Sequence, residues 1–290
     1  MINFESMRGY ARLVGWGPYL WRTFVRQFAK RVLRCDLELR LPTGLKLHLP
    51  RSSHYASVVW LTQAHVDEGC EEILFAWLET GGDFFDVGAH LGYYSLWCAP
   101  RVRRVHAFEP DRRNQPWLQQ NAIRAGNITV NFAAVSDFYG EIILCQDPSS
   151  AQSHVVGAGE LAISANPSVR VPCTTLDRYW HEQGRPSVGA LKIDVEGHEL
   201  AVLRGATEIF KVCRPIGLIE TVHAHRQELV AMLDAWQYRA VAAVASPAGR
   251  VLTVMDANFS PACDFTMVFL VPSEKAERFR HVGTTMLGIG

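Results

Sequence analysis

The sequence predicts an α/β domain that is built on an open, mostly parallel sheet. Residues 83–87 form a short apolar strand that runs into a glycine-rich turn and then into an apolar helix, which is how such a sheet forms a ligand crevice. Further apolar segments of strand length alternate with helical stretches, at 105–108, 128–135, 188–194 and 215–220. Strands that alternate with helices indicate βαβ units and a parallel sheet. A length of 290 residues suits one such domain with extensions.

The composition excludes several classes of protein. The chain has 29 Lys and Arg against 29 Asp and Glu, so we expect no nucleic-acid partner. Its seven cysteines are scattered and form no CxxC pair, which indicates reduced thiols in a cytoplasmic protein rather than disulfides or a zinc site. Because the sequence has neither an apolar stretch of about 20 residues nor a signal peptide, we expect no membrane-spanning helix.

Residues 1–35 differ from the rest of the chain because aromatic and basic residues are interleaved there. From residue 18 to residue 33 the pattern is that of an amphipathic helix, with Leu20, Phe24 and Phe28 on one stripe. A basic, aromatic-rich helix can lie on an anionic membrane surface, which would make the protein membrane-associated. The alternative, which the sequence favours, is a helix that packs on the main domain or on a second subunit of a homo-oligomer.

A β-hairpin follows the basic segment. Residues 37–41 and 45–49 alternate apolar and polar side chains on either side of a Pro-Thr-Gly turn. Residues 51–66 are predicted to be irregular, either as a plain connecting loop or as a source of substrate contacts from Ser52, Ser53, His54 and Tyr55. We therefore divide the chain into an N-terminal extension, residues 1–67, and a main domain, residues 68–290.

The glycine-rich turn carries the first candidate ligand contacts, which are Asp86, Gly88, His90 and Gly92. Glycine lets the backbone approach a ligand closely and adopt a positive φ without a Cβ clash. The helix after the turn presents free N–H groups to an anionic group. The sequence therefore predicts a nucleotide or nucleoside site at this turn.

The spacing of the turn favours S-adenosylmethionine over NAD. The glycines read GxxxG instead of the GxGxxG of dinucleotide sites, and Asp86 precedes the first of them. A carboxylate is favourable beside a sulfonium but would repel a pyrophosphate. Glu109 ends the next strand, where a carboxylate can bind both ribose hydroxyls. Ser136 and Asp137 follow the strand at 128–135 and are either contacts for the adenine amine or residues of a plain turn.

Five segments then occur in a fixed order along the chain: FFDVGAHLGYYSL, HAFEPD, AAVSDFYGE, TTLDRYW and LKIDVEGHELAVLRGA. Over about residues 68–240 they resemble the FkbM family of S-adenosylmethionine-dependent methyltransferases, with His90 where that family often has Asn. The resemblance implies a Rossmann-like class I methyltransferase fold, in which helices cover both faces of a mostly parallel, seven-stranded sheet. An antiparallel pair at 239–245 and 265–271 would complete this sheet. The resemblance also implies methyl transfer to a hydroxyl oxygen of a sugar, a glycan or a polyketide-type natural product.

Two regions of the chain are candidates for contacts with the acceptor. Residues 146–168 are rich in Ser, Gly, Asn and Pro, and a loop of this length in a compact domain is usually functional or disordered. We expect it to be a lid or an acceptor-binding loop, with His154 as a substrate contact. His223, which follows the strand at 215–220, is a second candidate for the acceptor pocket.

Lys192 is unusual because it lies within the apolar strand at 188–194. A buried ammonium needs a paired carboxylate. Side chains alternate along a strand, so Lys192 and Asp194 point to the same face. We expect Lys192 to pair with Asp194 or with Asp86 at the crevice, where it either positions the substrate or has a purely structural role.

Acidic residues and a histidine follow the same strand, where the methyl group should be transferred: Asp194, Glu196, His198 and Glu199. His198 is the preferred general base because the ordinary pKa of histidine is about 6.5. Asp194 would orient the acceptor or that imidazole, and Glu196 is a further catalytic candidate. Glu199 is typical of the first turn of a helix, where a carboxylate stabilises the dipole.

The same strand ends could also suit a metal ion. Asp194, Glu196, Glu220, His223 and His225 offer oxygen and nitrogen donors of the kind that Mg²⁺ or Mn²⁺ accepts. In the usual cation-dependent sugar methyltransferases, however, the acidic residues are arranged differently. We therefore expect a site without metal.

The leading hypothesis is an O-methyltransferase that uses S-adenosylmethionine on a small-molecule or glycan acceptor. The alternatives are an N- or carboxyl-methyltransferase, and a nucleoside-binding protein without turnover that contacts a membrane or a partner. A dehydrogenase is the least favoured alternative. The intact set of Asp86, Gly88, Gly92 and Glu109 argues against a protein that only binds.

Overall fold

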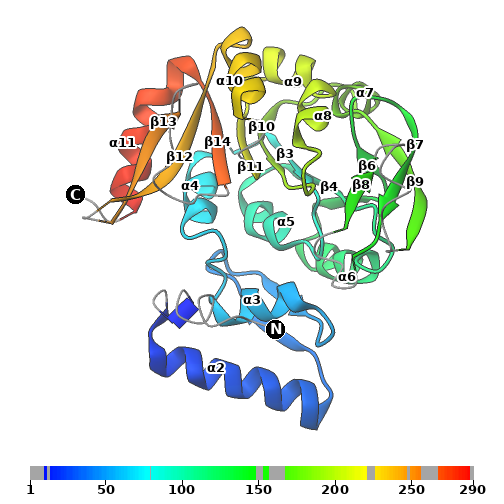
Figure 1. The fold of residues 1–290 in the computed structure, drawn as a ribbon, viewed down its shortest axis with the longest axis vertical. Coiled ribbons are helices and arrows are strands. Elements are labelled where there is room, and N and C mark those ends of the chain that lie inside the picture. The colour runs from blue at the N-terminus through cyan, green and yellow to red at the C-terminus, as the bar shows by residue number, and fades with distance from the viewer. Residues whose placement is uncertain are drawn as a thin grey trace.

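The computed structural model of the chain is shown in Figure 1. It describes residues 10–11, 14–78, 80–147, 153–156, 167–220, 226–246, 249–255 and 267–287. Within these residues, no helix combines the length and the hydropathy that a membrane crossing requires. The cysteines in this part of the chain are free thiols: Cys35, Cys70, Cys98, Cys145, Cys173 and Cys213.

An eight-stranded sheet forms the centre of the fold, in the order β13-β12-β14-β11-β10-β3-β4-β5. Five neighbouring strands run parallel: β5 (Ile128–Asn131), β4 (Arg104–Phe108), β3 (Asp83–Val87), β10 (Val188–Ile193) and β11 (Ile216–Glu220). The other three strands each pair antiparallel with their neighbours: β14 (Met267–Pro272), β12 (Tyr238–Ser246) and β13 (Gly249–Met255). The mostly parallel sheet with an antiparallel end is confirmed.

The prediction of seven strands was too low because β13 adds a strand at the edge. It pairs with β12 along its whole length, from Ala240 opposite Met255 to Ser246 opposite Gly249. The predicted antiparallel strands 239–245 and 265–271 correspond to β12 and β14, and the strand between them in the sequence, β13, was not predicted.

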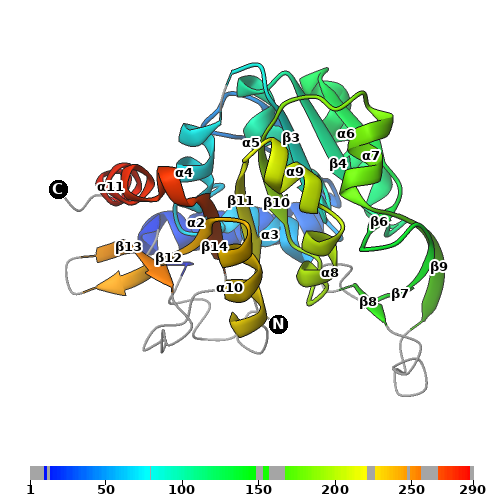
Figure 2. The same cartoon turned by 90° about the horizontal axis from the view of Figure 1, so that it is seen from above.

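Helices cover both faces of the main sheet (Figures 1 and 2). One face packs against α4 (Cys70–Trp77), α5 (Tyr93–Cys98) and α11 (Ala276–Met286). The other packs against α7 (Leu176–Glu182), α8 (Glu199–Arg204), α9 (Thr207–Val212) and α10 (Arg226–Ala235). Because side chains alternate along a strand, Phe84 lies in the first of these cores and Phe85 in the second.

Among the described residues, one further α-helix and two single-turn helices complete the main domain. The α6 helix (Gln115–Ala125) packs beside β5 and ends at Gly126, which is in the left-handed conformation that glycine adopts readily at a helix C-terminus. Single-turn helices are η2 (Ala99–Arg101) and η4 (Ser273–Lys275).

A second sheet of four strands, in the order β6-β9-β7-β8, lies at the end of the molecule opposite β13 and α11 (Figures 1 and 2). Its strands are β6 (Ala134–Val135), β7 (Gly140–Cys145), β8 (His154–Val156) and β9 (Ser168–Thr174). Two expectations need correction here. The predicted strand 128–135 is divided, because its second half leaves the main sheet and pairs with β9. The predicted loop 146–168 contains β8, which pairs with β7.

The N-terminal elements are α2 (Trp16–Phe28), which continues as the π-helix η1 (Ala29–Leu33), the hairpin β1 (Leu37–Arg40) and β2 (Lys46–Leu49), and α3 (His54–Leu61). The helix and the hairpin are confirmed. The expectation that residues 51–66 are irregular was wrong, since α3 starts there with the Ser53 hydroxyl accepting a hydrogen bond from the N–H of Ala56. The division of the chain at residue 67 stays a prediction.

Candidate active site

A pocket opens at the carboxyl ends of β3, β4 and β10, the edge where the sequence predicts a ligand crevice. Its empty volume is about 850 Å³. The main sheet contributes polar residues to its wall, and the second sheet contributes apolar ones. The predicted site residues that line it are Asp86, Gly88, His90, Glu109, Lys192, Asp194 and Glu196.

The turn after β3 requires glycine for two reasons. Gly88 has a φ of +77°, and a Cβ at this position would lie 1.8 Å from the carbonyl oxygen of Asp194. His90 also has a positive φ, of 52°, and Gly92, with a φ of 86°, caps the start of α5. The turn therefore passes directly over the end of β10, which brings the predicted cofactor side and the predicted catalytic side of the pocket together.

Glu109 is held rigidly at the end of β4. One carboxylate oxygen accepts a hydrogen bond of 2.8 Å from the N–H of His90, and the other accepts one of 2.8 Å from the N–H of Asp111. Burial raises the pKa of Glu109 to about 7, although these backbone donors oppose the rise. The carboxylate lines the pocket, so its remaining lone pairs can accept from two vicinal hydroxyls.

Strand β3 and the turn after it contain buried polar atoms that have no hydrogen-bond partner. Asp86 is fully buried, and while its Oδ2 accepts from the Ser95 hydroxyl at 2.5 Å, its Oδ1 has no hydrogen-bond partner. The two ring nitrogens of His90 are also buried without partners. Burial, together with the nearby charge of Lys192, lowers the pKa of His90 to about 4, so the imidazole is neutral. These atoms fit a ligand that has a positive charge and hydrogen-bond donors, as the methionine end of S-adenosylmethionine does.

Lys192 and Asp194 form the predicted ion pair, with 2.7 Å between Nζ and Oδ2. The ammonium also lies 5.2 Å from the centre of the Tyr94 ring, which is favourable for a cation. Burial alone would lower the pKa of Lys192, but the charges of Asp194 and Asp86 outweigh it, and the pKa is raised. Lys192 is therefore charged at neutral pH. Burial would raise the pKa of Asp194, but the charge of Lys192 opposes this effect, and the pKa of Asp194 is lowered.

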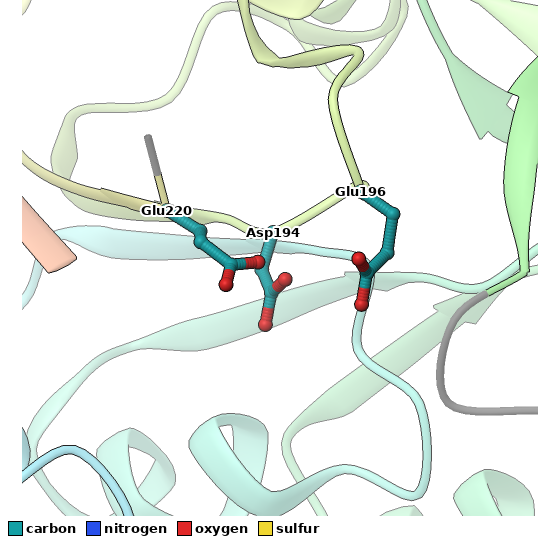
Figure 3. Close-up of side chains that lie close together, drawn as sticks. All are labelled: Asp194, Glu196 and Glu220. Carbon is teal, nitrogen blue, oxygen red and sulfur yellow. The ribbon is translucent and has the colours of Figure 1, made fainter. Parts of the chain in front are cut away.

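Figure 3 shows three acids at neighbouring strand ends, with the carboxylates of Asp194, Glu196 and Glu220 directed toward the same space. One carboxylate oxygen from each lies within 4.8 Å of the others. Burial and the charge of Asp194 raise the pKa of Glu220 to about 9 and that of Glu196 to about 7. His154 and Lys192 oppose the rise at Glu196. In the described part of the chain, these three residues are the acids that could jointly hold a metal ion.

Glu196 is the one acid here with an unusual backbone. It has a φ of 52°, and Gly197 after it has a φ of 94°. A positive φ costs energy for a residue with a Cβ and is often found at functional sites. The turn directs the Glu196 side chain into the pocket, where it is a lining residue.

The same turn directs His198 elsewhere. Its Nε2 lies 2.8 Å from the hydroxyl of Ser136, outside the set of residues that line the pocket. Asp137 lies beside this pair and accepts from Ser136 at 3.2 Å. Neither Ser136 nor Asp137 lines the pocket; the neighbouring Val135 and Ala134 do.

The remaining predicted site residues do not line the pocket or lie outside the described part of the chain. Gly92 shapes the turn but is not a wall residue, and His154 lies in β8 beside the lining residues Ser153 and Val155. His223 lies outside the described residues. Four residues of the pocket wall were not identified from the sequence: Tyr94, Phe108, Asn114 and Leu144. Tyr55, which also lines the pocket, was named only as one of four possible substrate contacts in a loop.

The model of the family described as "Methyltransferase FkbM domain" matches residues 86–241. A curated relative, the hexuronic acid methyltransferase AglP of Haloferax volcanii, is 29% identical over 123 residues, which are 42% of this chain and 49% of that protein. The chain thus spans about half the length of this relative. Among solved structures, methyltransferase FkbM from Methylobacillus flagellatus is 18% identical with a TM-score of 0.46, over 74% of this chain and 52% of that one.

A second solved structure, a SAM-dependent methyltransferase from Agrobacterium tumefaciens, is 11% identical with a TM-score of 0.41, over 81% of this chain and 69% of that one. The family match covers more than half of the chain and includes both the glycine-rich turn and the acids after β10. This chain belongs to the FkbM family of methyltransferases, and its methyl donor is S-adenosylmethionine.

Proposed function

We propose that the protein is an O-methyltransferase that transfers the methyl group of S-adenosylmethionine to a hydroxyl of a sugar, a glycan or a natural product. The observation that carries the proposal is Glu196, a pocket acid whose pKa is raised to about 7. A base with such a pKa is ionised in part of the molecules at neutral pH and can accept the proton of an alcohol. A hydroxyl acceptor needs such a base.

The residues of the glycine-rich turn would hold the donor. Glu109 would accept hydrogen bonds from the two ribose hydroxyls. Asp86 would face the positively charged end, where its partnerless oxygen can accept a hydrogen bond. Val135 and Leu144 would give the adenine an apolar surface. When bound, the donor supplies an electrophilic methyl group on a sulfonium sulfur.

The acids after β10 would act on the acceptor. Glu196 would accept the hydroxyl proton while the acceptor oxygen forms a bond to the methyl carbon and the bond from carbon to sulfur breaks. The products would be a methyl ether and S-adenosylhomocysteine. Lys192 would keep Asp194 ionised, so that Asp194 can accept a hydrogen bond and fix the direction of the acceptor. His198, the base preferred from sequence, is replaced in this scheme by Glu196.

The charge of the pocket supports a hydroxyl acceptor over a carboxyl one. An ionised carboxyl acceptor would face Asp194 and Glu196, and like charges at this range repel. A neutral hydroxyl meets no such penalty. The similarity to a hexuronic acid methyltransferase supports a sugar as the acceptor class. A hexuronic acid has both hydroxyl groups and a carboxyl group, so the argument for a hydroxyl acceptor rests on the charge of the pocket alone.

Formation of S-adenosylhomocysteine with a panel of sugar nucleotides, lipid-linked glycans and macrolide-like alcohols tests the proposal. We expect turnover with at least one acceptor and a fall of about 10²–10⁴ in kcat for Glu196→Gln. The rate of the wild-type enzyme should rise with pH through about 7, the pKa of Glu196. The matched variant is His198→Gln, which should change kcat by less than about tenfold if His198 is not the base.

Three results would contradict the proposal. A protein that binds the donor but releases no S-adenosylhomocysteine with any acceptor would be a binding protein. A product whose methyl group is lost in mild alkali would be a methyl ester, and Glu196→Gln would then keep its rate. A loss of turnover in His198→Gln, with Glu196→Gln unaffected, would restore His198 as the base.

A further inference from the structure

The outward face of α2 and η1 carries a row of large apolar side chains. Seven of them are between 42% and 64% exposed: Trp16, Leu20, Trp21, Phe24, Phe28, Val32 and Leu33. Trp21, Phe24 and Phe28 stack in sequence, with 5.9 Å between successive ring centroids. Exposed apolar side chains in a contiguous row indicate an interaction surface, because isolated ones are ordinary but patches are not.

The opposite face of the same helix is fixed to the protein. Arg26 is 1% exposed, and its guanidinium donates to the carbonyl oxygens of Leu49 and Pro50 and to the Ser57 hydroxyl. Tyr19 is 2% exposed on the same side. The indole N–H of Trp60 donates to the carbonyl of Arg22 at 2.9 Å. Because these contacts satisfy a buried guanidinium, turning the helix to bury its apolar row would leave that charge without partners.

The apolar stripe therefore does not pack on the main domain, which was one half of the favoured interpretation; the other half, packing on a second subunit, stays a prediction. The stripe of Leu20, Phe24 and Phe28 points away from the protein, and the inward stripe contains an arginine. Figure 1 shows α2 at the outer edge of the molecule, with α3 between it and the main domain.

The segment is strongly cationic. Residues 14–35 contain no Asp or Glu but five basic residues, Arg22, Arg26, Lys30, Arg31 and Arg34. Burial lowers the pKa of Lys30, and the charges of Arg26 and Arg31 lower it further. Since the whole chain has equal numbers of acidic and basic residues, this cluster is a local feature and not a general basic character.

We propose that the outward face of α2 and η1 docks on the surface of an anionic lipid membrane. Aromatic and aliphatic side chains would enter the boundary between headgroups and acyl chains, and the exposed Arg31 and Arg34 would contact lipid phosphates. The α2 helix has 13 residues, which is about 20 Å and too short to span a hydrocarbon core of about 30 Å. It would therefore lie along the surface.

Charge decides between a membrane and a second copy of the chain. A symmetric dimer through this face would place the same cationic segments of two copies against each other, and like charges would oppose it. An anionic membrane offers negative charge to Arg31 and Arg34, the exposed arginines of the segment. This proposal is independent of the proposed acceptor.

Co-sedimentation of the full chain with vesicles tests it. We expect binding to phosphatidylcholine vesicles that contain phosphatidylglycerol, weaker binding to pure phosphatidylcholine, and a decrease as salt is raised. Phe24→Ser combined with Phe28→Ser should lower binding more than about tenfold, because both side chains leave the apolar boundary. Arg31→Glu should lower it roughly twentyfold, since one cation is lost and one anion gained near the lipid surface.

Matched controls come from helices α6 and α9, which are not part of the proposed docking face. Ile123, on α6, is 81% exposed, and Lys211, on α9, is exposed as well. Ile123→Ser and Lys211→Glu should leave binding unchanged. All variants should keep the thermal unfolding midpoint of the wild type, because none of the changed side chains is buried.

The proposal fails if the wild-type chain stays in the supernatant with both vesicle types. It also fails if binding is equal with and without the anionic lipid, or if the two control variants bind as weakly as the α2 variants. A dimer in solution that Phe24→Ser with Phe28→Ser converts to a monomer, in the absence of vesicle binding, would instead assign this face to a second copy.

Discussion

The ammonium of Lys192 lies 2.7 Å from the carboxylate of Asp194 at the exit of the central strand, with only 5% of the lysine side chain exposed. The two residues are two positions apart on one strand, so both side chains leave the same face of the sheet. The pair connects the donor side of the pocket, where Asp86 lies, with the acids that would act on the acceptor. In the proposed reaction, its charge balance should therefore affect both donor binding and the acceptor side.

Removal of the lysine charge should destabilise the protein and reduce its activity. In Lys192→Met, Asp194 would remain partly buried without its cation. We expect the free energy of unfolding to fall by about 1–3 kcal/mol, less than for a fully buried pair because the Asp194 side chain is 35% exposed. Urea unfolding measures this change. Lys211→Met, at an exposed site, should be neutral; an equal loss in both variants would contradict the role of the pair.

Donor affinity should depend on the ionised form of Glu109. Glu109→Gln keeps the size of the side chain but removes its charge, so we expect S-adenosylhomocysteine to bind about 10–100-fold more weakly. Because the pKa of Glu109 is raised to about 7, affinity of the wild type should decrease as the pH falls from about 8 to about 6, as the carboxylate gains a proton.

Calorimetric titration measures both effects of Glu109. In Glu109→Gln the part of the pH dependence that belongs to this carboxylate should disappear. Glu208→Gln, an exposed acid on α9, is the control and should bind as the wild type does. Unchanged affinity in Glu109→Gln would remove the ribose contact from the scheme.

The glycine at position 88 should be intolerant of any side chain. Gly88→Ala would place a Cβ 1.8 Å from the carbonyl oxygen of Asp194, which no side-chain movement can relieve. Gly126→Ala is a close control, since Gly126 has nearly the same φ, +79° against +77°, but no atom within 4 Å of the added Cβ. We expect Gly126→Ala to cost about 1–2 kcal/mol from backbone strain alone, and Gly88→Ala to cost several kcal/mol more and to abolish donor binding. Thermal unfolding of both variants checks this, and equal costs would contradict the close approach.

A chelator should leave the rate within about twofold of its untreated value. Two features reduce the negative charge of the cluster formed by Asp194, Glu196 and Glu220. Lys192 pairs with Asp194, and Glu220, whose pKa is raised to about 9, is protonated at neutral pH. A divalent ion prefers several ionised oxygen ligands. Turnover with EDTA, and with added Mg²⁺ or Mn²⁺, measures this. A large loss that the ion restores, and that Glu220→Gln reproduces, would show a metal-dependent enzyme.

The part of the site that could be predicted from sequence is the part that local geometry determines. Asp86, Gly88 and Glu109 are placed by a strand, a turn and the end of the next strand, and the pairing of Lys192 with Asp194 follows from alternation along one strand. The position of His198 could not be read in this way. Positive φ angles at Glu196 and Gly197 turn the chain between the strand and α8, and this turn directs His198 to Ser136 instead of the pocket.

The remaining differences come from contacts between distant segments. The apolar wall from Leu144 and Val155 depends on the pairing of β7, β8 and β9, whose strands are separated by segments rich in Ser and Gly. An apolar run such as 128–135 does not reveal that its two halves belong to different sheets. Tyr55 reaches the pocket from α3, where its ring contacts His90 edge to face. The α3 helix contains β-branched and aromatic residues, which on their own favour a strand.

The separate origin of the two walls has a consequence for how this enzyme could diversify. The proposed contacts of Asp86 and Glu109 with the donor come from β3 and the end of β4 in the central sheet, while the wall residues Leu144 and Val155 come from the smaller sheet. The smaller sheet is joined to the larger one through chain connections and not through shared strand pairing. Exchange of the segment from β7 to β9 between relatives would thus replace the apolar wall that Leu144 would present to the adenine, while the carboxylate of Glu109 and the acids after β10 stay in place.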